Sequence, residues 1–331
     1  MSSSVPIVLQ PAGVVKKARL GTPLRDLLFE HGVEFPCGGR GRCYGCRVHV
    51  LEGHLRESRR DQEHFSLKEL QEGWRLACQH SVEGPLTLEL AQWEERILTG
   101  HKDFVFTPGM GLGIAVDLGT TTLAAQLIDM EDGTTLAVET ALNPQGKWGA
   151  DVMSRIHASL FEGQASDLKS AIRKALAGMI DGLLGSPAGK KVIRQKKLQR
   201  ILLVGNTVMH HLFCGYSVEP LAGRPFESPH GGTVRFLPAE LGWDHLDPLT
   251  SILFLPCIGG FVGSDILAGI LAVDMHRGIP GQLLMDLGTN GELVIGNGQR
   301  LYCASTAAGP AFEGGRISCG MRAVTGAISE V

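Results

Sequence analysis

The fold of the N-terminal part of this chain is decided by one stretch, Cys37-Gly-Gly-Arg-Gly-Arg-Cys43-Tyr-Gly-Cys46. Its spacing is C-x5-C-x2-C, and a fourth cysteine, Cys78, stands alone further along the chain. Four thiolates suffice to hold one 2Fe–2S cluster, two on each iron. The glycines between them let the backbone wrap closely and turn its N–H groups toward the sulfides. We therefore predict a 2Fe–2S cluster bound by Cys37, Cys43, Cys46 and Cys78.

A structural zinc site is the alternative use of four cysteines. Zinc sites usually carry two short Cys-x2–4-Cys pairs, and here only Cys43 and Cys46 form such a pair. The observed spacing differs by one residue from the plant-type C-x4-C-x2-C pattern of iron–sulfur proteins. Residues 1–92 resemble ferredoxin domains, and this resemblance implies a β-grasp fold of the α+β class.

Local patterns in residues 1–92 fit a small sheet with one helix and a long cysteine loop. Thr22 is a suitable N-cap, Pro23 suits the first helical position, and Gly32 would end that helix. Strands are expected over residues 5–10, 47–51 and 86–90. Residues 93–112 are mixed and polar and contain Pro108-Gly109, so we expect a linker there.

An internal repeat marks the rest of the chain. The segment Ala115-Val-Asp-Leu-Gly-Thr-Thr-Thr-Leu123 is echoed by Leu284-Met-Asp-Leu-Gly-Thr-Asn-Gly-Glu292. Two strand–turn–strand units with the same Asp-Leu-Gly-Thr indicate a duplicated domain. Between them, periodicity predicts helices within 150–184 and over 264–275, and strands over 114–117, 123–129, 201–204 and 252–255.

The two repeated turns resemble the phosphate loops of the superfamily of acetate and sugar kinases, heat-shock-70 chaperones and actin. This resemblance implies an α/β, ribonuclease H-like ATPase module whose two halves close over ATP. Glycine lets backbone N–H groups approach phosphate oxygens, and threonine hydroxyls donate hydrogen bonds. The implied nucleotide-binding residues are Gly119, Thr120, Thr121, Thr122, Gly288, Thr289 and Asn290.

Three aspartates are candidates for the chemistry of this module, although no catalytic residue is assigned. Asp117 and Asp286 end their strands and could position Mg2+ with its waters, because Mg2+ keeps several waters and few carboxylates. Asp265 follows Val-Gly-Ser and is a candidate to order a catalytic water. A Ser-x-Asp pairing at that position is equally typical of a helix N-cap.

Further segments resemble one family, the reductive activators of corrinoid proteins. They are Asn143-Pro-Gln145, Trp148-Gly-Ala-Asp151-Val-Met-Ser-Arg-Ile156, Gly205-Asn-Thr-Val-Met-His-His-Leu212, Phe261-Val-Gly-Ser-Asp265 and Ala308-Gly-Pro-Ala-Phe-Glu-Gly-Gly315. The resemblance covers the whole chain in matching order. It implies a ferredoxin domain over 1–92, a linker over 93–112, the first half of the ATPase module over 113–278 and the start of the second half over 279–331.

The family resemblance implies an activity. The cluster takes one electron from a low-potential donor and passes it to a corrinoid protein, where Co(II) becomes Co(I). A plant-type cluster lies near ~−400 mV, and Co(I) is a stronger reductant, so the transfer is uphill. Each ~59 mV of shortfall costs a factor of ten for one electron, and ATP would supply the difference.

The chain departs from the family in length. The second half of the ATPase module begins at residue 279 and stops at Val331, so it is far shorter than the first half. We expect a C-terminally truncated module that alone binds ATP poorly. An oligomer or a second polypeptide would complete it.

Composition limits the remaining possibilities. The net charge of −3 argues against a general nucleic-acid or membrane-surface binder, and no apolar run reaches the ~18 residues of a membrane span. Cysteines without a recognisable signal peptide favour metal ligands or thiols over disulfides, so we expect a cytoplasmic protein. Arg40, Arg42 and Arg47 lie in or beside the cysteine loop, and they form either a solvated face or a docking surface for an acidic partner.

Two other functions remain open. The chain could be a ferredoxin-type electron carrier or reductase subunit whose actin-like part is only a docking module, or a small-metabolite kinase with a redox sensor. The pair His210-His211 is more typical of packed or exposed helix residues than of metal ligands. The distal cysteines share no metal spacing and are interpreted as buried thiols, namely Cys214, Cys257, Cys303 and Cys319.

Overall fold

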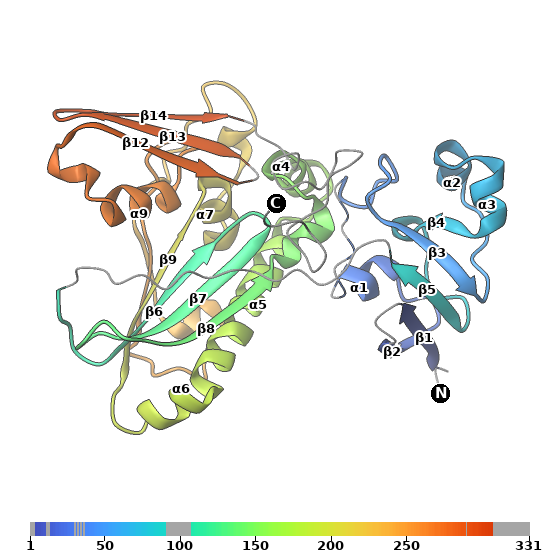
Figure 1. The fold of residues 1–331 in the computed structure, drawn as a ribbon, viewed down its shortest axis with the longest axis horizontal. Coiled ribbons are helices and arrows are strands. Elements are labelled where there is room, and N and C mark those ends of the chain that lie inside the picture. Colours follow the sequence, from blue (N-terminus) through green and yellow to red (C-terminus); the bar gives the residue numbers. More distant parts are fainter. Residues whose placement is uncertain are drawn as a thin grey trace, which may run out of the picture. The chain divides into compact units, whose positions relative to one another are not determined.

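The computed structural model describes residues 4–306 apart from 11–13, 91–106 and the single positions 30, 32, 34, 36 and 289. The chain divides into two compact units (Figure 1). Unit 1 contains the N-terminal residues and the segment Pro144–Arg155, and unit 2 contains the remaining described residues. The predicted linker over 93–112 falls largely outside the described residues, and the predicted helix end at Gly32 falls outside them too.

A five-stranded mixed sheet with one packed helix forms the core of unit 1. Its strand order is β2-β1-β5-β3-β4, in which only β1 and β5 run parallel. Apolar side chains alternate along β1 and β5 and meet helix α1 at Leu24 and Leu28, which are fully buried. The elements are β1 (Ser4–Gln10), β2 (Val14–Arg19), α1 (Leu24–Phe29), β3 (Arg47–Glu52), β4 (Trp74–Leu76) and β5 (Leu86–Leu90).

Two short helices lie between β3 and β4. Helix α2 (Arg59–His64) and helix α3 (Leu67–Glu72) each begin with a capping box, in which a serine hydroxyl and an acidic side chain three residues later satisfy each other's backbone N–H groups. Helix α3 ends at Gly73, whose φ of 97° is the left-handed conformation that favours glycine at a helix end. A 3-10 turn, η1 (Ala77–Gln79), then carries the fourth cysteine.

A six-stranded sheet forms the centre of unit 2, in the order β10-β11-β9-β6-β7-β8. The central strands β11, β9 and β6 run parallel, so their carboxyl ends meet at one edge of the sheet. Strand β7 pairs antiparallel with β6 and β8. The bounds are β6 (Leu112–Leu118), β7 (Thr122–Asp129), β8 (Thr135–Leu142), β9 (Leu198–Gly205), β10 (Val234–Phe236) and β11 (Ser251–Phe254).

The long helix α5 (Ala165–Gly185) packs against β7 and β8 and also contacts α7. Its buried residues Leu168, Ile172, Leu176 and Ile180 recur at four-residue spacing, in agreement with the helix predicted within 150–184. The remaining helices and 3-10 turns are η2 (Pro144–Trp148), α4 (Val152–Phe161), α6 (Pro187–Val192), α7 (Thr207–Cys214), η3 (Glu219–Leu221), α8 (Pro238–Leu241), α9 (Ser264–Ala272) and η4 (Met275–Arg277).

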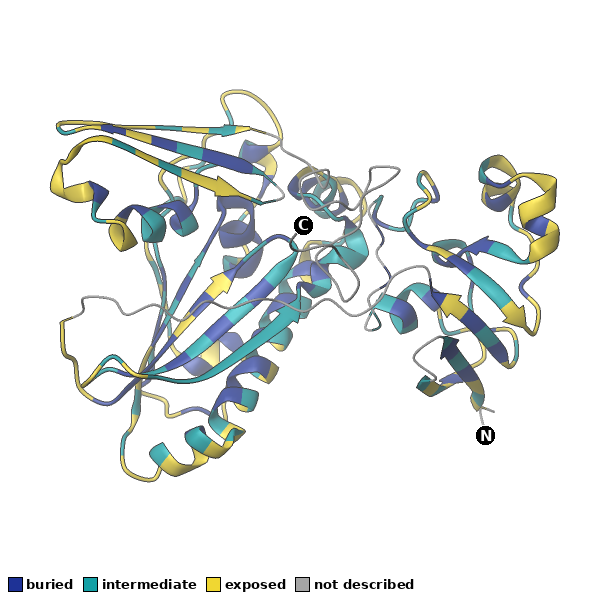
Figure 2. Cartoon of the chain, viewed as in Figure 1, coloured by how far each residue is buried: buried dark blue, intermediate teal, exposed yellow. Residues whose placement is uncertain are grey.

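A separate three-stranded sheet follows α9. Strands β12 (Pro280–Leu287), β13 (Gly291–Asn297) and β14 (Leu301–Thr306) pair in that order, all antiparallel. One face packs on α9 through Leu284 and Val294. The opposite face carries the exposed apolar residues Leu283, Met285, Leu287, Ile295 and Tyr302. Figure 2 colours exposed residues of this sheet yellow. The apolar exposure lies on a sheet face, and β12, which carries Leu283, Met285 and Leu287, is also an edge strand of this sheet within the described residues.

No helix within the described ranges combines the length and the apolar composition that crossing a membrane requires. This finding agrees with the absence of a long apolar run in the sequence.

Candidate functional site

The cysteine loop joins the end of α1 to β3 and takes a conformation that needs glycine. Gly38, Gly39 and Gly41 all have φ between 62° and 79°, the left-handed region that other residues adopt at a cost. At Gly41 a Cβ atom would also lie 2.9 Å from the Arg60 side chain and 3.0 Å from that of Gln79. The loop therefore closes tightly over the turn that carries Cys78.

The structure brings the four predicted cysteine ligands together as two pairs. The thiols of Cys37 and Cys43 are hydrogen-bonded to each other, and so are those of Cys46 and Cys78. Two pairs of thiols suit two iron atoms with two thiolates each. Within the described ranges, no three Cys, His, Asp or Glu side chains gather closely enough to hold a single metal ion. The donor set thus fits a 2Fe–2S cluster better than one zinc ion.

Hydrogen bonds favour thiolates in this loop. The contact from Cys43 and the backbone N–H groups of Arg42, Arg40 and Gly39 hold the pKa of Cys37 near 5. The pKa of Cys78 is also lowered, first by Cys46 and then by the Gln79 side chain and the Gly41 N–H. Within each pair the second thiol keeps the proton, which raises the pKa of Cys43 and Cys46. Iron binds thiolates, so one thiol of each pair is favoured as the thiolate and the other would lose its proton on binding iron.

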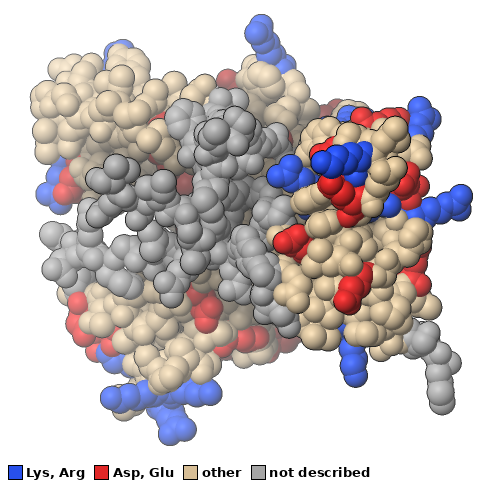
Figure 3. Space-filling view, turned by 45° about the vertical axis from the view of Figure 1, so that its right-hand side comes forward, with Lys and Arg blue, Asp and Glu red and all other residues tan. Residues whose placement is uncertain are grey.

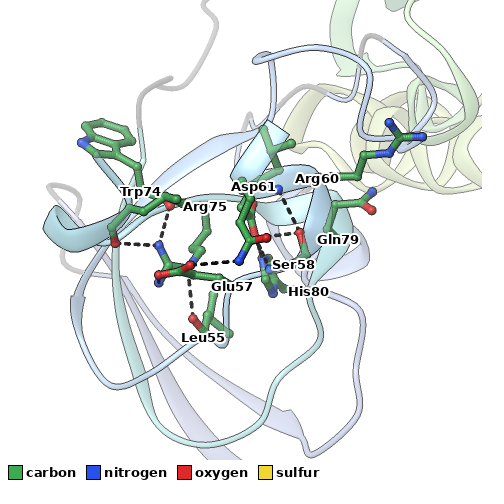
Figure 4. Close-up of polar contacts among 12 residues, drawn as sticks. Leu55, Glu57, Ser58, Arg60, Asp61, Trp74, Arg75, Gln79 and His80 are labelled. Carbon is green, nitrogen blue, oxygen red and sulfur yellow. Dashed lines mark hydrogen bonds and ion pairs between the residues drawn. The ribbon is translucent and has the colours of Figure 1, made fainter. Parts of the chain in front are cut away.

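A buried carboxylate, Asp61 on α2, fixes the turn that presents Cys78 (Figure 4). Its Oδ1 accepts the Leu76 N–H at 2.8 Å, and its Oδ2 accepts from the Ser58 N–H, the Ser58 hydroxyl and the His80 ring at 2.7–2.8 Å. Burial alone would raise the pKa of Asp61, yet the bonds from His80, Leu76 and Ser58 hold it at about 2. Asp61 therefore clamps both ends of residues 76–80.

The first predicted phosphate turn, between β6 and β7, is held by asparagines from distant segments. A Cβ at Gly119 would lie 2.5 Å from the Thr122 carbonyl, so only glycine fits this turn. Asn143 donates from its side chain to the Gly119 carbonyl at 2.8 Å and from its backbone to the Thr121 carbonyl. Asn206 donates to the Thr120 hydroxyl at 2.8 Å. Thr120 is buried, while Thr121 and Thr122 are half-buried.

The same sheet edge receives the start of α9. Ser264 exchanges hydrogen bonds with the backbone of Gly205 at 3.1 and 3.2 Å. A Cβ at Gly263 would lie 2.3 Å from the Gly205 carbonyl, so these two segments touch backbone to backbone. Asp265 thereby lies beside the carboxyl ends of β6 and β9, where Asp117 is the last residue but one of β6.

Four carboxylates from different elements influence one another at this edge. Burial, followed by the charges of Asp265 and Asp286, raises the pKa of Asp117 to about 6, even though its side chain retains access to solvent. Burial and Asp286 raise the pKa of Asp265 to about 6, and burial raises that of Asp286. Glu292 on β13, 7% exposed, has its pKa raised to about 7 by burial, Asp265 and Asp286. Such a cluster attracts a cation, and the raised pKa values show how poorly the negative charge is balanced without one.

The structure thus places Asp117, Asp265 and Asp286 where their charges influence one another, and it adds Glu292, which the sequence did not single out. Glu292 pairs opposite Asp286 across β12 and β13 and accepts a hydrogen bond from Ser305 at 3.1 Å. Its place at the end of the second repeat, opposite the repeated aspartate in a hairpin, was the available signal.

The second phosphate turn is less constrained than the first. A Cβ at Gly288 would meet only ordinary contacts, and the Gly288 N–H bonds to the Asn290 carbonyl at 3.0 Å. Thr289 lies outside the described residues. These nucleotide-binding residues remain predictions.

The histidine pair is buried, and no metal group forms around it within the described ranges. His211 bonds to the Thr207 carbonyl and the Ser228 hydroxyl, each at 2.7 Å, as a packed helix residue does. Cys214, Cys257 and Cys303 are half-buried, and burial raises the pKa of each. Cys319 lies outside the described residues.

Replacing Glu292 by Gln is expected to stabilise the protein at pH 8 and to have little effect at pH 5. A carboxyl whose pKa is raised on folding binds more protons in the native state, so its ionisation destabilises the fold as pH rises from about 4 to 7. The expected gain in melting temperature at pH 8 is roughly 2–4 °C, the shift for about 1 kcal/mol.

Scanning calorimetry of wild type and Glu292→Gln at both pH values measures this difference. Glu227→Gln, an exposed carboxylate of the same unit, is the control. An equal effect of Glu292→Gln at both pH values would contradict the electrostatic explanation.

Comparison with known protein families accounts for all three parts of the chain. A model described as the 2Fe-2S iron-sulfur cluster binding domain matches residues 8–83. A model of the RACo middle region matches residues 112–278, which is just over half of the chain, and a model of the C-terminal ASKHA domain of RACo matches residues 281–331. The chain belongs to the RACo family. The predicted family of reductive activators of corrinoid proteins is thereby confirmed.

Two RACo-like relatives are similar over most of this chain. Corrinoid activation enzyme RamQ of Eubacterium limosum is 35% identical over 243 residues, covering 71% of this chain and 40% of the relative. The Co(II) methylated amine-specific corrinoid protein reductase of Methanosarcina barkeri is 31% identical over 230 residues, covering 66% of this chain and 40% of the relative. The chain spans about 40% of the length of these relatives.

A solved structure supports the RACo fold. The reductive activator for a corrinoid, iron–sulfur protein superposes with a TM-score of 0.58 at 22% identity, covering 97% of this chain and 66% of that one. At this identity the likeness concerns the fold alone. The predicted fold, a 2Fe–2S ferredoxin-type domain followed by an actin-like ASKHA module, is confirmed.

Proposed function

We propose that this chain is an iron–sulfur electron-transfer protein that activates a corrinoid methyl-transfer protein by reducing its Co(II) to Co(I), with ATP as the energy source. The observation that carries the proposal is the presence of two thiol pairs in unit 1 and a carboxylate cluster beside a phosphate-type turn in unit 2 of one chain. The names of the two relatives, a corrinoid activation enzyme and a corrinoid protein reductase, support it.

In this proposal Cys37 and Cys43 hold one iron, and Cys46 and Cys78 hold the other. The cluster, when bound, supplies a one-electron carrier. The chain's own contribution is to hold the thiolates in pairs and to aim backbone N–H groups at the sulfur atoms, for example from Arg42 to Cys37. Such donors stabilise the extra negative charge of the reduced state.

The carboxylate cluster would hold Mg2+ and its waters against nucleotide phosphates. Asp117 and Asp286 come from the two repeated turns, and Asp265, in the first turn of α9, influences the pKa of Asp117 and could orient a water. Gly119 and Gly288, with the Thr120–Thr122 and Thr289–Asn290 segments, would contact the phosphates. Because no three of the described acidic or thiol side chains gather around one point, a bound Mg2+ would depend largely on waters and phosphate oxygens.

The partners in this proposal are a low-potential electron donor and the corrinoid protein, in the cytoplasm. Arg42 and Arg47, beside the cluster ligands, are exposed and would steer an acidic partner. On the face of unit 1 seen in Figure 3, basic and acidic side chains are interspersed, so steering would depend on the arginines nearest the cluster rather than on a uniformly basic surface.

The test is electron transfer to a Co(II) corrinoid protein under anaerobic conditions, with a low-potential chemical reductant, followed by the visible spectrum of the cobalt. We expect Co(I) to form faster with Mg-ATP than without nucleotide, and added salt to slow the transfer. The chain with the distal change Cys303→Ser is the matched control and should behave as wild type. If the rate of Co(I) formation does not depend on nucleotide, the alternative is favoured, in which the chain is an electron carrier and its ASKHA part serves only as a docking module. No transfer at all, from a chain that holds a reducible cluster, would overturn the proposal.

A further inference from the structure

A side-chain amide reaches one of the cysteine ligands from the turn that follows it. Gln79 Nε2 lies 3.2 Å from Cys78 Sγ and 3.1 Å from the Gly39 carbonyl oxygen. Both partners accept hydrogen bonds, since a ligating cysteine carries no proton and a carbonyl has none. The amide nitrogen, with its two N–H groups, must therefore face them, which fixes the orientation of the side chain.

The surroundings hold Gln79 in this position. Its amide lies directly over Gly41, where a Cβ would come within 3.0 Å of the nitrogen, so the glycine makes room for the contact. The flanking residues are tied to Asp61, because Leu76 donates its N–H and His80 its ring nitrogen to that carboxylate, each at 2.8 Å. Gln79 is half-buried on this turn (Figure 4). A bound cluster at Cys78 would meet this donor already in place.

The physical effect of such a donor has a definite sign. One-electron reduction adds a negative charge to the cluster and its thiolates, and a hydrogen bond to a thiolate sulfur stabilises that charge more than it stabilises the oxidised state. The donor therefore raises the reduction potential. Backbone N–H groups near the cysteines act in the same direction but cannot be removed by a change of side chain, whereas the contribution of Gln79 can.

We infer that Gln79 is a tuning residue that sets the reduction potential of the cluster through its hydrogen bond to Cys78, while its second N–H anchors the cysteine loop at Gly39. The inference rests on the proposed ligation of the cluster by Cys78. It does not depend on the corrinoid partner or on ATP.

The experiment is a redox titration of the full chain, monitored by the visible absorbance of the cluster and by the EPR signal of its reduced form. Gln79→Met keeps the length of the side chain and removes both donors. We expect the equilibrium constant for one-electron reduction to fall about tenfold, which is 59 mV at 25 °C. Gln79→Glu, which places an acceptor and a negative charge there, should lower the potential further. Gln62→Met, an exposed position on α2, is the matched control and should titrate as wild type.

A merely structural role would give a different pattern. If Gln79→Met released iron faster to a chelator but titrated at the wild-type potential, the tuning role would be wrong. The same conclusion would follow if Gln79→Glu left the reduction potential unchanged. If Gln79→Met does not bind the cluster, the potential of Gln79→Glu alone tests the tuning role. Failure of the wild-type chain to bind iron would instead overturn the ligation proposed for Cys78. Failure to reduce a corrinoid protein would leave the titration result standing.

Discussion

Replacing Cys78 by Ser is expected to reduce the iron content from two per chain to nearly none after anaerobic gel filtration. Cys78 is paired with Cys46, and in our proposal the two thiolates hold one iron between them. A serine oxygen is a harder and weaker ligand for iron than a thiolate, so that iron loses half of its protein ligands. Electron transfer to a corrinoid protein should be lost with the cluster.

The matched control is Cys303→Ser, a half-buried cysteine on β14 in unit 2. Metal analysis and the visible spectrum of freshly prepared anaerobic protein compare the two variants. We expect the control to keep two irons, two sulfides and the red-brown colour of the wild type. Full iron retention by Cys78→Ser would show that another residue is the fourth ligand. Stoichiometric zinc in the colourless wild type would show that the centre is not an iron–sulfur cluster.

The cluster loop was predictable because its evidence is local. Three of the four cysteines lie within ten residues of sequence, and the glycines that their loop requires stand between them. Strand β5 has the predicted bounds, Leu86–Leu90, because its residues alternate between the core and the surface. The paired Asp-Leu-Gly-Thr turns were recognisable because the motif is repeated. In the structure the charge of Asp286 raises the pKa of Asp117.

Elements that depend on polar local signals were missed. Helices α2 and α3 lie in a charged stretch with little apolar periodicity, and the capping boxes that start them, at Ser58 and Ser66, are two short Ser-x-x-acid patterns. The helix expected over 264–275 ends at Ala272, because Asp274 adopts a left-handed φ of 57° that a helix cannot continue through. A separate 3-10 turn begins at Met275.

The residues that hold the first phosphate turn were not predictable from its own sequence. Asn143 and Asn206 reach Gly119 and Thr120 from segments 24 and 86 residues away. Glu292 had one sequence signal, its place at the end of the second repeat, but the influence of Asp265 on its pKa comes from a different element. Long-range pairing decides these contacts, and a single sequence does not reveal it.

Asp61 is the strongest case of such a long-range contact, and its replacement by Asn is expected to destabilise unit 1 by about 3–4 kcal/mol, because buried donors lose a charged acceptor. The carboxyl group is fully buried and accepts four hydrogen bonds from Ser58, Leu76 and His80. An amide offers one acceptor oxygen in place of two. Its nitrogen would face the N–H of either Leu76 or Ser58, and the N–H that it faces would lose its acceptor.

The effect of this change should depend on pH with a definite sign. The pKa of Asp61 is held at about 2, below the ~3.9 expected of an unfolded chain, so its charge stabilises the fold above pH 4. That contribution is lost as pH falls from about 4 toward 2. The wild type and Asp61→Asn should therefore differ most at pH 7 and converge in acid.

Hydrogen exchange of peptides spanning residues 58–80, followed by mass spectrometry, measures the loss where it occurs. At pH 7 we expect exchange of the slowest amides to accelerate by roughly 100- to 1,000-fold, since each 1.4 kcal/mol is a factor of ten. Glu83→Gln, an exposed carboxylate of the same unit, is the control and should exchange as wild type. Because Asp61 clamps residues 76–80, the variant should also release iron to a chelator faster than the control. If the amides of Asp61→Asn exchange as slowly as those of the wild type, the turn bearing Cys78 is held by the cluster itself rather than by the buried carboxylate.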